Sequence, residues 1–178
     1  MEKTGKILEN NTILLRKPEP EDLEFLYSLE NNPDFWFVSD THTPFSRWQI
    51  KQHIENSVYD IFTNKELRLI IEQKSDNSKV GIIDLFEFDP KHNRAGVGIL
   101  IKKDFQNKGL AAQALLLIID YSFKILLLNQ LWCFIDVTNE ISIKLFSNMG
   151  FAKCGHLKAW KRTDKSYSDT FIYQLLNT

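Results

Sequence analysis

The sequence has few of the residues that mark disulfide-rich, fibrous or disordered proteins. Of its 178 residues only two are cysteine, five are proline and seven are glycine, whereas 43% are hydrophobic and 25% are charged. These proportions are those of an ordinary globular protein. A chain of this length can bury a sizeable core by itself, so we predict a single domain that spans residues 1–178.

An excess of charge of one sign is also lacking, because the formal net charge is only -1. A protein whose affinity comes from neutralising many phosphates of DNA or RNA needs a strong positive excess. The composition therefore argues against nucleic acid as a partner.

Long hydrophobic runs are absent as well. The longest, ALLLIID at 114–120, is too short to span a bilayer, which takes about 20 apolar residues. Residues 1–17 carry charges on both sides of a very short apolar patch and resemble neither a secretory signal nor a membrane anchor. We expect no contact with a membrane and a cytoplasmic location.

The two cysteines, Cys133 and Cys154, lie in separate apolar segments. They form no C-x-x-C pair and have no histidines nearby at the spacing of metal ligands. We predict two buried thiols in a reducing compartment and no metal site, with a disulfide between them as the alternative.

Hydrophobic periodicity predicts one mixed α/β unit in the order β-α-α-β-β-β-α-β-α-β-β. Pro33 is expected to end the first helix, and Ser46 with Gln49 has the spacing of a capping box at the start of the second. Residues 33–45 between them are predicted to be a loop. The predicted strands are 12–18, 66–74, 79–88, 94–103, 131–137, 151–160 and 166–176, and the predicted helices are 19–32, 46–62, 110–126 and 140–149.

The stretch DFQNKGLA at 104–111 joins a strand that ends near Lys102 to a helix that begins near Gly109. The first N–H groups of a helix lack internal partners and lie at the positive end of its dipole, so they favour an anion such as a pyrophosphate. Lys103 and Lys108 add positive charge nearby. The alternative is a glycine at a tight turn with solvated lysines around it.

A family resemblance favours the anion site. Gln106, Gly109 and Ala111 match the acyl-CoA pyrophosphate signature [QR]-x-x-G-x-[GA] of the GNAT N-acetyltransferase superfamily, and residues 137–151, VTNEISIKLFSNMGF, resemble its second conserved block. The resemblance implies a GNAT fold, a single mixed and mostly antiparallel sheet flanked by helices. It also implies acetyl-CoA as co-substrate.

The resemblance implies roles for matched positions. The backbone of Ile99, Leu100 and Ile101 would pair with the pantetheine amides of acetyl-CoA, and Asn139, Ser142 and Phe146 would lie along the pantetheine. Without the resemblance, Asn139 is a helix N-cap and Ser142 a solvent-facing hydroxyl. The residues that would wrap the pyrophosphate are Gln106, Asn107, Lys108, Gly109, Leu110 and Ala111.

Within the superfamily the sequence is similar to the spermidine and diamine N-acetyltransferases and to the ribosomal-protein N-acetyltransferases. That likeness implies transfer of an acetyl group to a primary amine, of a small molecule or a peptide N-terminus, by direct attack in a ternary complex. A homo-oligomer is compatible with it. The alternative is an acyl-CoA-binding module without efficient catalysis.

Two residues that relatives use in the chemistry are replaced here. Phe146 stands where the polyamine enzymes carry a tyrosine that donates a proton to the leaving thiolate, and Gly96 stands where relatives carry a glutamate. A phenyl ring cannot donate a proton. The remaining catalytic candidates are Asp84, which would take the proton of the amine and whose pKa an apolar cleft would raise, and then Ser142, which would assist the leaving thiolate. For Asp84 the alternative is an exposed carboxylate at an edge or turn.

The resemblance implies that residues 34–45 and the two helices around them select the substrate, because these elements flank the cleft opposite the cofactor in the family. Aromatic residues of this region either form an apolar wall of the cleft or close the core over the sheet. Three acidic residues are candidates to receive a cation. The aromatic residues are Phe35, Trp36, Phe37 and Trp48, and the acidic ones are Asp34, Asp40 and Glu87.

Overall fold

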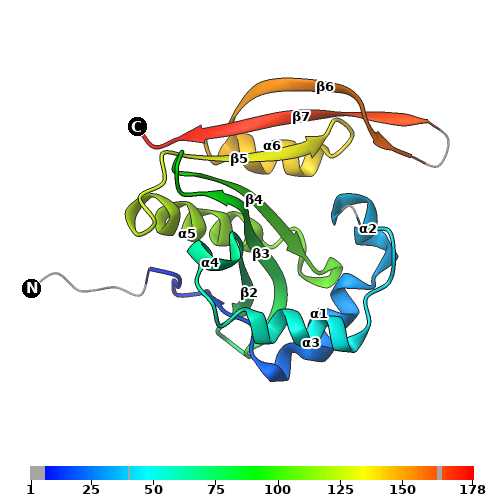
Figure 1. The fold of residues 1–178 in the computed structure, drawn as a ribbon, viewed down its shortest axis with the longest axis vertical. Coiled ribbons are helices and arrows are strands. Elements are labelled where there is room, and N and C mark those ends of the chain that lie inside the picture. Colours follow the sequence, from blue (N-terminus) through cyan, green and yellow to red (C-terminus); the bar gives the residue numbers. More distant parts are fainter. Residues whose placement is uncertain (1–6, 40, 164–165) are drawn as a thin grey trace, which may run out of the picture.

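Alternating apolar residues build a seven-stranded sheet in the order β1-β2-β3-β4-β5-β7-β6, with helices on both faces (Figure 1). The computed structural model describes residues 7–39, 41–163 and 166–178. The strands are β1 (Ile13–Arg16), β2 (Leu67–Gln73), β3 (Ser78–Asp89), β4 (Arg94–Ile101), β5 (Gln130–Asp136), β6 (Ala152–Arg162) and β7 (Tyr167–Leu176). The predicted strands are thus confirmed, with shifts of a few residues at their ends.

The helices are η1 (Pro20–Asp22), α1 (Leu23–Glu30), α2 (Pro33–Ser39), α3 (Arg47–Asn56), α4 (Ile61–Asn64), η2 (Lys103–Phe105), α5 (Leu110–Lys124) and α6 (Glu140–Asn148). At the start of α3, the Ser46 side chain accepts from the Gln49 N–H and the Gln49 side chain bonds back to the Ser46 N–H. The predicted capping box is therefore confirmed.

The predicted loop at 33–45 is wrong in its first half, which is helix α2. The Asn32 side chain accepts a hydrogen bond from the Asp34 N–H at 3.1 Å, and Pro33 occupies the first helical position. A capping asparagine followed by proline is a favoured helix start, because proline at that position gives up no needed donor. Pro33 separates two helices rather than only ending one.

The predicted helix at 46–62 is two helices. Helix α3 ends at Asn56, and α4 begins afresh because the Asp60 side chain accepts from the Thr63 N–H at 2.9 Å. Aspartate at an N-cap starts a helix in preference to continuing one. The observed order therefore has two more short α-helices than the predicted one.

The sheet divides into two parts that meet at β4 and β5. Strands β1 to β4 form an antiparallel meander, and β5, β7 and β6 are also antiparallel to one another. Among the strands of the described residues only β4 and β5 are parallel to each other, and they pair over just Arg94–Gln130, Ala95–Leu131 and Gly96–Trp132. Beyond Gly96 the two strands are not paired.

Two apolar clusters hold the helices on opposite faces of the sheet. Helix α5 packs Leu115 and Ile118 into the larger cluster, while α1 and α3 bring Leu26 and Ile54 to the smaller one on the other face (Figure 1). In the described part of the chain, no helix is long and apolar enough to cross a membrane.

The cysteines differ in their surroundings. Cys133 is buried in the larger cluster, and burial raises the pKa of its thiol to about 12. Cys154 is exposed, so the prediction that it is buried is wrong. It lies on β6, which is an edge strand of the sheet. An apolar residue on an edge strand does not have to face the core. Both thiols are free.

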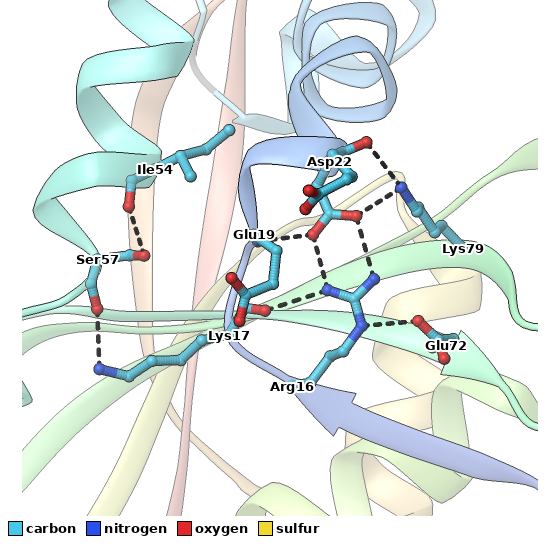
Figure 2. Close-up of polar contacts among 9 residues, drawn as sticks. Arg16, Lys17, Glu19, Asp22, Ile54, Ser57, Glu72 and Lys79 are labelled. Atoms are coloured by element: carbon cyan, nitrogen blue, oxygen red, sulfur yellow. Dashed lines mark hydrogen bonds and ion pairs between the residues drawn. The ribbon is translucent and has the colours of Figure 1, made fainter.

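A buried carboxylate joins β1 and η1 to the centre of the sheet (Figure 2). Asp22, which is 1% exposed, accepts from Arg16 Nη1 at 2.7 Å and from Arg16 Nη2 at 3.0 Å. It also meets Lys79 Nζ at 2.6 Å and the Glu19 N–H at 2.8 Å. Arg16 in turn donates to Glu72. Burial would raise the pKa of Asp22, but these donors outweigh it and lower the pKa to about 2.

Replacing Asp22 with asparagine is expected to destabilise the fold in a pH-dependent way. The folded pKa of about 2 lies below the unfolded value of about 3.9, so the stabilisation is complete above that value and is lost as pH falls through the folded pKa. We expect Asp22→Asn to lower the free energy of unfolding by roughly 2 kcal/mol at pH 7 and by about half as much at pH 3. Urea titrations at both pH values measure this.

Asp120→Asn is the matched control, because Asp120 belongs to an exposed pair with Lys124 on α5. It should cost less than about 1 kcal/mol at either pH. A loss in Asp22→Asn that is the same at pH 7 and pH 3 would contradict the expected ionic origin.

Candidate active site

The site begins where β4 and β5 separate. Along β4, Ile99, Leu100 and Ile101 pair with β3 on one side only, because the pairing with β5 has ended at Gly96. The peptide groups of this segment that point away from β3 are thus open to whatever lies between the strands.

The turn after β4 leads directly into α5. Gly109 is the N-cap of α5 and has φ +73°, a left-handed conformation that glycine adopts at little cost. A Cβ built on Gly109 would meet no atom within 4 Å, so space lies in front of the helix start. The Gln106 side chain donates to the Ile101 carbonyl at 3.0 Å and fixes the turn to the end of β4.

A first cavity of about 410 Å³ lies between this turn, β4 and α6. It brings together most of the residues that the sequence analysis assigned to the acyl-CoA site. They are Ile99, Leu100, Ile101, Gln106, Asn107, Gly109, Leu110, Ala111, Asn139 and Ser142. Lys108 does not line it; its ammonium lies 5.0 Å from the ring of Phe105.

The start of α6 borders this cavity. The Asn139 side chain accepts from the Ser142 N–H at 3.1 Å, so Asn139 is indeed an N-cap. Ser142 is half-buried and lines the first cavity as well as the one described next.

A second cavity, of about 680 Å³, adjoins the first. Ile99, Asn139 and Ser142 line both cavities. The residues that line the second cavity but not the first include Phe37, Glu87, Asp136, Phe146, Trp160 and Lys161. The structure therefore has two adjacent cavities that share residues of β4 and of the start of α6.

Phe146 is 3% exposed and packs its ring edge-on against Phe151 at 5.1 Å. It contributes a wall to the second cavity and no proton donor.

No carboxylate can come from position 96. An ideal Cβ on Gly96 would lie 2.3 Å from the ring of Phe86, which itself packs edge-on against Trp132 at 5.2 Å. The Phe86 ring thus fills the space that a longer side chain on Gly96 would need.

Asp84 lies in a third cavity, of about 370 Å³, between β2 to β4 and helices α1 and α3. Its two oxygens accept from Arg68 Nε at 2.9 Å and from Arg68 Nη2 at 2.8 Å, and Arg68 Nη1 also bonds to Glu30. Burial would lower the pKa of Arg68, but the two carboxylates raise it further, so Arg68 stays charged.

The expectation of an apolar cleft around Asp84 is therefore wrong. Its carboxylate is held by two hydrogen bonds from a permanent cation, Arg68. Neither is it an edge or turn carboxylate, because β3 lies inside the sheet. Arg68 and Glu30 were missed by sequence reasoning, although a single arginine within the strand LRLIIE is a signal of a buried ion pair.

The predicted aromatic wall is only partly present. Phe35 lines the first and third cavities and Phe37 the second, whereas the indole of Trp36 donates to the Glu30 carbonyl at 2.9 Å. Trp48 is 69% exposed on α3, so its place in the wall is wrong.

The acidic candidates are also divided. Asp34 lines the first cavity and Glu87 the second, while Asp40 lies outside the described residues.

Similarity to known protein families and solved structures agrees with this geometry. The model of the Acetyltransferase (GNAT) domain family matches residues 12–152. The chain belongs to the GNAT acetyltransferase family. It is accordingly an N-acetyltransferase that uses acetyl-CoA as co-substrate to acetylate an amine, and its seven-stranded mixed sheet is the GNAT fold.

Several similar proteins have a named activity or a solved structure. The chain is 31% identical to spermidine N(1)-acetyltransferase of Escherichia coli K12 over 83% of this chain and 76% of the relative. It is 30% identical to the Vibrio cholerae enzyme of that name over 83% of each. A solved complex of spermidine N-acetyltransferase from Vibrio cholerae with CoA and spermine has a TM-score of 0.86 at 26% identity, covering 94% of this chain and 96% of that one.

Replacing Gly109 with glutamate is expected to abolish the stabilisation of the protein by acetyl-CoA, because it puts bulk and negative charge into the space before α5. Acetyl-CoA at a hundred times its dissociation constant should stabilise the wild type by about 2.7 kcal/mol. The melting temperature with and without acetyl-CoA measures this.

Gly109→Ala is the control, since it carries the same backbone strain of roughly 1 kcal/mol without the charge. It should keep a shift on adding acetyl-CoA. An undiminished shift in Gly109→Glu would remove the turn from the cofactor site.

Proposed function

We propose that the chain transfers an acetyl group from acetyl-CoA to a primary amine of a small, cationic, polyamine-like molecule, with both substrates bound at once. The observation that carries the proposal is the pair of cavities that share Ile99, Asn139 and Ser142. The first borders the glycine turn and suits acetyl-CoA; the second holds the amine. The similarity to spermidine N-acetyltransferases supports this acceptor class.

The second cavity has the character that such an acceptor needs. Aromatic residues line it, and so do the acidic residues Glu87 and Asp136. Aromatic faces and carboxylates together attract ammonium groups and accommodate the methylene chain between them.

The residues of the first cavity position the thioester that acetyl-CoA supplies. Open peptide groups of β4 fix the pantetheine beside the site, and the N–H groups at the start of α5 with the Gly109 turn hold the pyrophosphate. The neutral amine nitrogen then attacks the carbonyl carbon, the carbon–sulfur bond breaks, the nitrogen releases one proton to water, and the sulfur takes up a proton. Positioning of two reactants side by side supplies a large part of the rate.

We propose Ser142 as the donor of that proton. Ser142 lines both cavities, whereas Phe146 has no proton to give and Asp84 is paired with Arg68. Assistance to the thiolate is also the role that the sequence analysis gave to Ser142.

The same proposal includes a cytoplasmic location and assembly with further copies of the chain. One solved relative, spermidine N-acetyltransferase from Vibrio cholerae, is described as dodecameric and has a TM-score of 0.79 to this chain.

An amine panel tests the acceptor class. We expect spermidine, spermine and butane-1,4-diamine to release free thiol from acetyl-CoA, with kcat/KM at least about tenfold above that of a short peptide with a free N-terminus, because only the polyamines present several cations to the acidic cavity. A peptide that is preferred would contradict the polyamine assignment.

The absence of the tyrosine favours one other function, an acyl-CoA-binding module without efficient turnover. Thiol that is released with no amine of the panel, while acetyl-CoA still raises the melting temperature, would decide for that module.

The proton donor is tested by variants on α6. Ser142→Ala should lower saturating turnover by about tenfold to a hundredfold without weakening acetyl-CoA binding, because general-acid assistance is lost. Phe146→Tyr alone should change turnover little, but in the Ser142→Ala background it should restore part of the loss, since it brings a hydroxyl to the same cavity. Steady-state kinetics with the best amine measure both.

Ser147→Ala is the matched control, because Ser147 is exposed on the same helix. Turnover that is unchanged in Ser142→Ala would exclude the serine as donor and leave positioning as the main contribution of the protein.

A further inference from the structure

One carboxylate that borders the second cavity has no counterpart in the expected catalytic set. Asp136 is the last residue of β5 and is 7% exposed. Its Oδ1 accepts from the Thr138 N–H at 2.8 Å and from Thr138 Oγ1 at 2.6 Å. Within the described part of the chain, its Oδ2 is buried and has no hydrogen-bond partner.

A buried carboxylate oxygen without a partner is costly, because it has lost its hydration. Half of the Asp136 carboxylate is thus occupied by a local turn, and the other half is buried without a hydrogen-bond partner in a residue that lines the cavity. The turn also fixes the direction of the carboxylate, so its second oxygen is held ready rather than free to rotate.

The position of Asp136 relates it to the reaction. Strand β5 has separated from β4 after Trp132, so Asp136 lies beyond the point of divergence. The cavity that it lines is also lined by Gly98 and Ile99 of β4 and by Ser142. The carboxylate therefore shares a space with the strand that positions the thioester and with the proposed proton donor.

Charge in this cavity favours a cation at Asp136. Burial opposes the ionised form, but the hydrogen bonds from Thr138, the nearby Ser168 hydroxyl, which itself donates to the Asp169 carbonyl at 3.4 Å, and the nearby charge of Lys161 outweigh it and lower the pKa of Asp136. The carboxyl group is ionised at neutral pH. The other charged residues that line the cavity are Glu87, which is exposed, and Lys161, whose ammonium donates to the Phe37 carbonyl at 3.1 Å.

We propose that Asp136 is the residue that recognises the cationic acceptor, with Oδ2 accepting a hydrogen bond from an acceptor nitrogen in the second cavity. It does so in place of a carboxylate on β4, which Phe86 excludes at Gly96. This inference rests on the proposed function, because it takes the second cavity as the acceptor site. Asp136 is an acceptor-binding residue and transfers no proton in this role.

Asp136→Asn tests the assignment, because an asparagine oxygen can still accept from Thr138 while the negative charge is lost. With spermidine as acceptor, we expect KM for spermidine to rise about tenfold or more, the loss expected for a hydrogen bond to a charged group. Saturating turnover should change little, and KM for acetyl-CoA and the melting temperature should stay as in the wild type. Thiol release and thermal unfolding give these values.

Asp120→Asn is again the control, since it removes the same charge from an exposed position on α5. It should leave both KM values unchanged. If Asp136→Asn does not fold, the variants Asp136→Glu and Asp136→Gln, equal in size and different in charge, replace it, and KM for spermidine should be lower in the glutamate variant.

Two results would overturn the inference while leaving the proposed function intact. One is a folded Asp136→Asn whose KM for spermidine stays within about twofold of the wild type, with or without a lower melting temperature, which would make Asp136 a residue of the turn only. The other is an equal rise in Asp120→Asn, which would indicate general charge attraction. A wild type that releases no thiol with spermidine would instead reject the polyamine acceptor, and this inference with it.

Discussion

The short pairing between β4 and β5 is the constraint on which the rest of the site depends. Two parallel strands that share only three paired positions leave peptide groups unpaired along the remainder of β4. Peptide groups inside a protein need partners, so this separation is sustained only if something else provides them. The turn at Gly109, the start of α6 and the two adjoining cavities all meet along this edge.

Much of the fold followed from local patterns. Alternation predicted the strands, the apolar periodicity of 110–126 predicted α5, and Ser46 with Gln49 marked the start of α3, because each of these signals acts over a few residues. The errors arose where a local signal had two meanings. Pro33 was interpreted as a helix stop, yet with Asn32 before it the same residue starts a helix. Asp60 likewise divided a continuous apolar pattern.

The candidate site was predictable where a family motif covered it and not elsewhere. The turn around Gly109 and the residues Asn139 and Ser142 line one cavity as the motifs implied. The partners of Arg68 were not predictable: the arginine in LRLIIE signals an ion pair, but the carboxylates that join it, Asp84 and Glu30, come from other elements, 16 and 38 positions away. Position 96 shows the same limit, since the Phe86 ring from the neighbouring strand takes the space that a Cβ would need there. Contacts between distant elements leave no periodicity in the chain.

The wall of the second cavity has a consequence for the order in which the protein assembles. Lys161 of β6 donates to the Phe37 carbonyl of α2, a contact between residues 124 positions apart. By contrast, β4, the Gly109 turn and α5 are consecutive and can organise as soon as that part of the chain has been made. Closing so long a loop lowers the entropy of the chain, and this cost comes before the contact can stabilise the fold. The second cavity is thus a property of the finished chain, whereas the Gly109 turn is a property of one continuous segment within it.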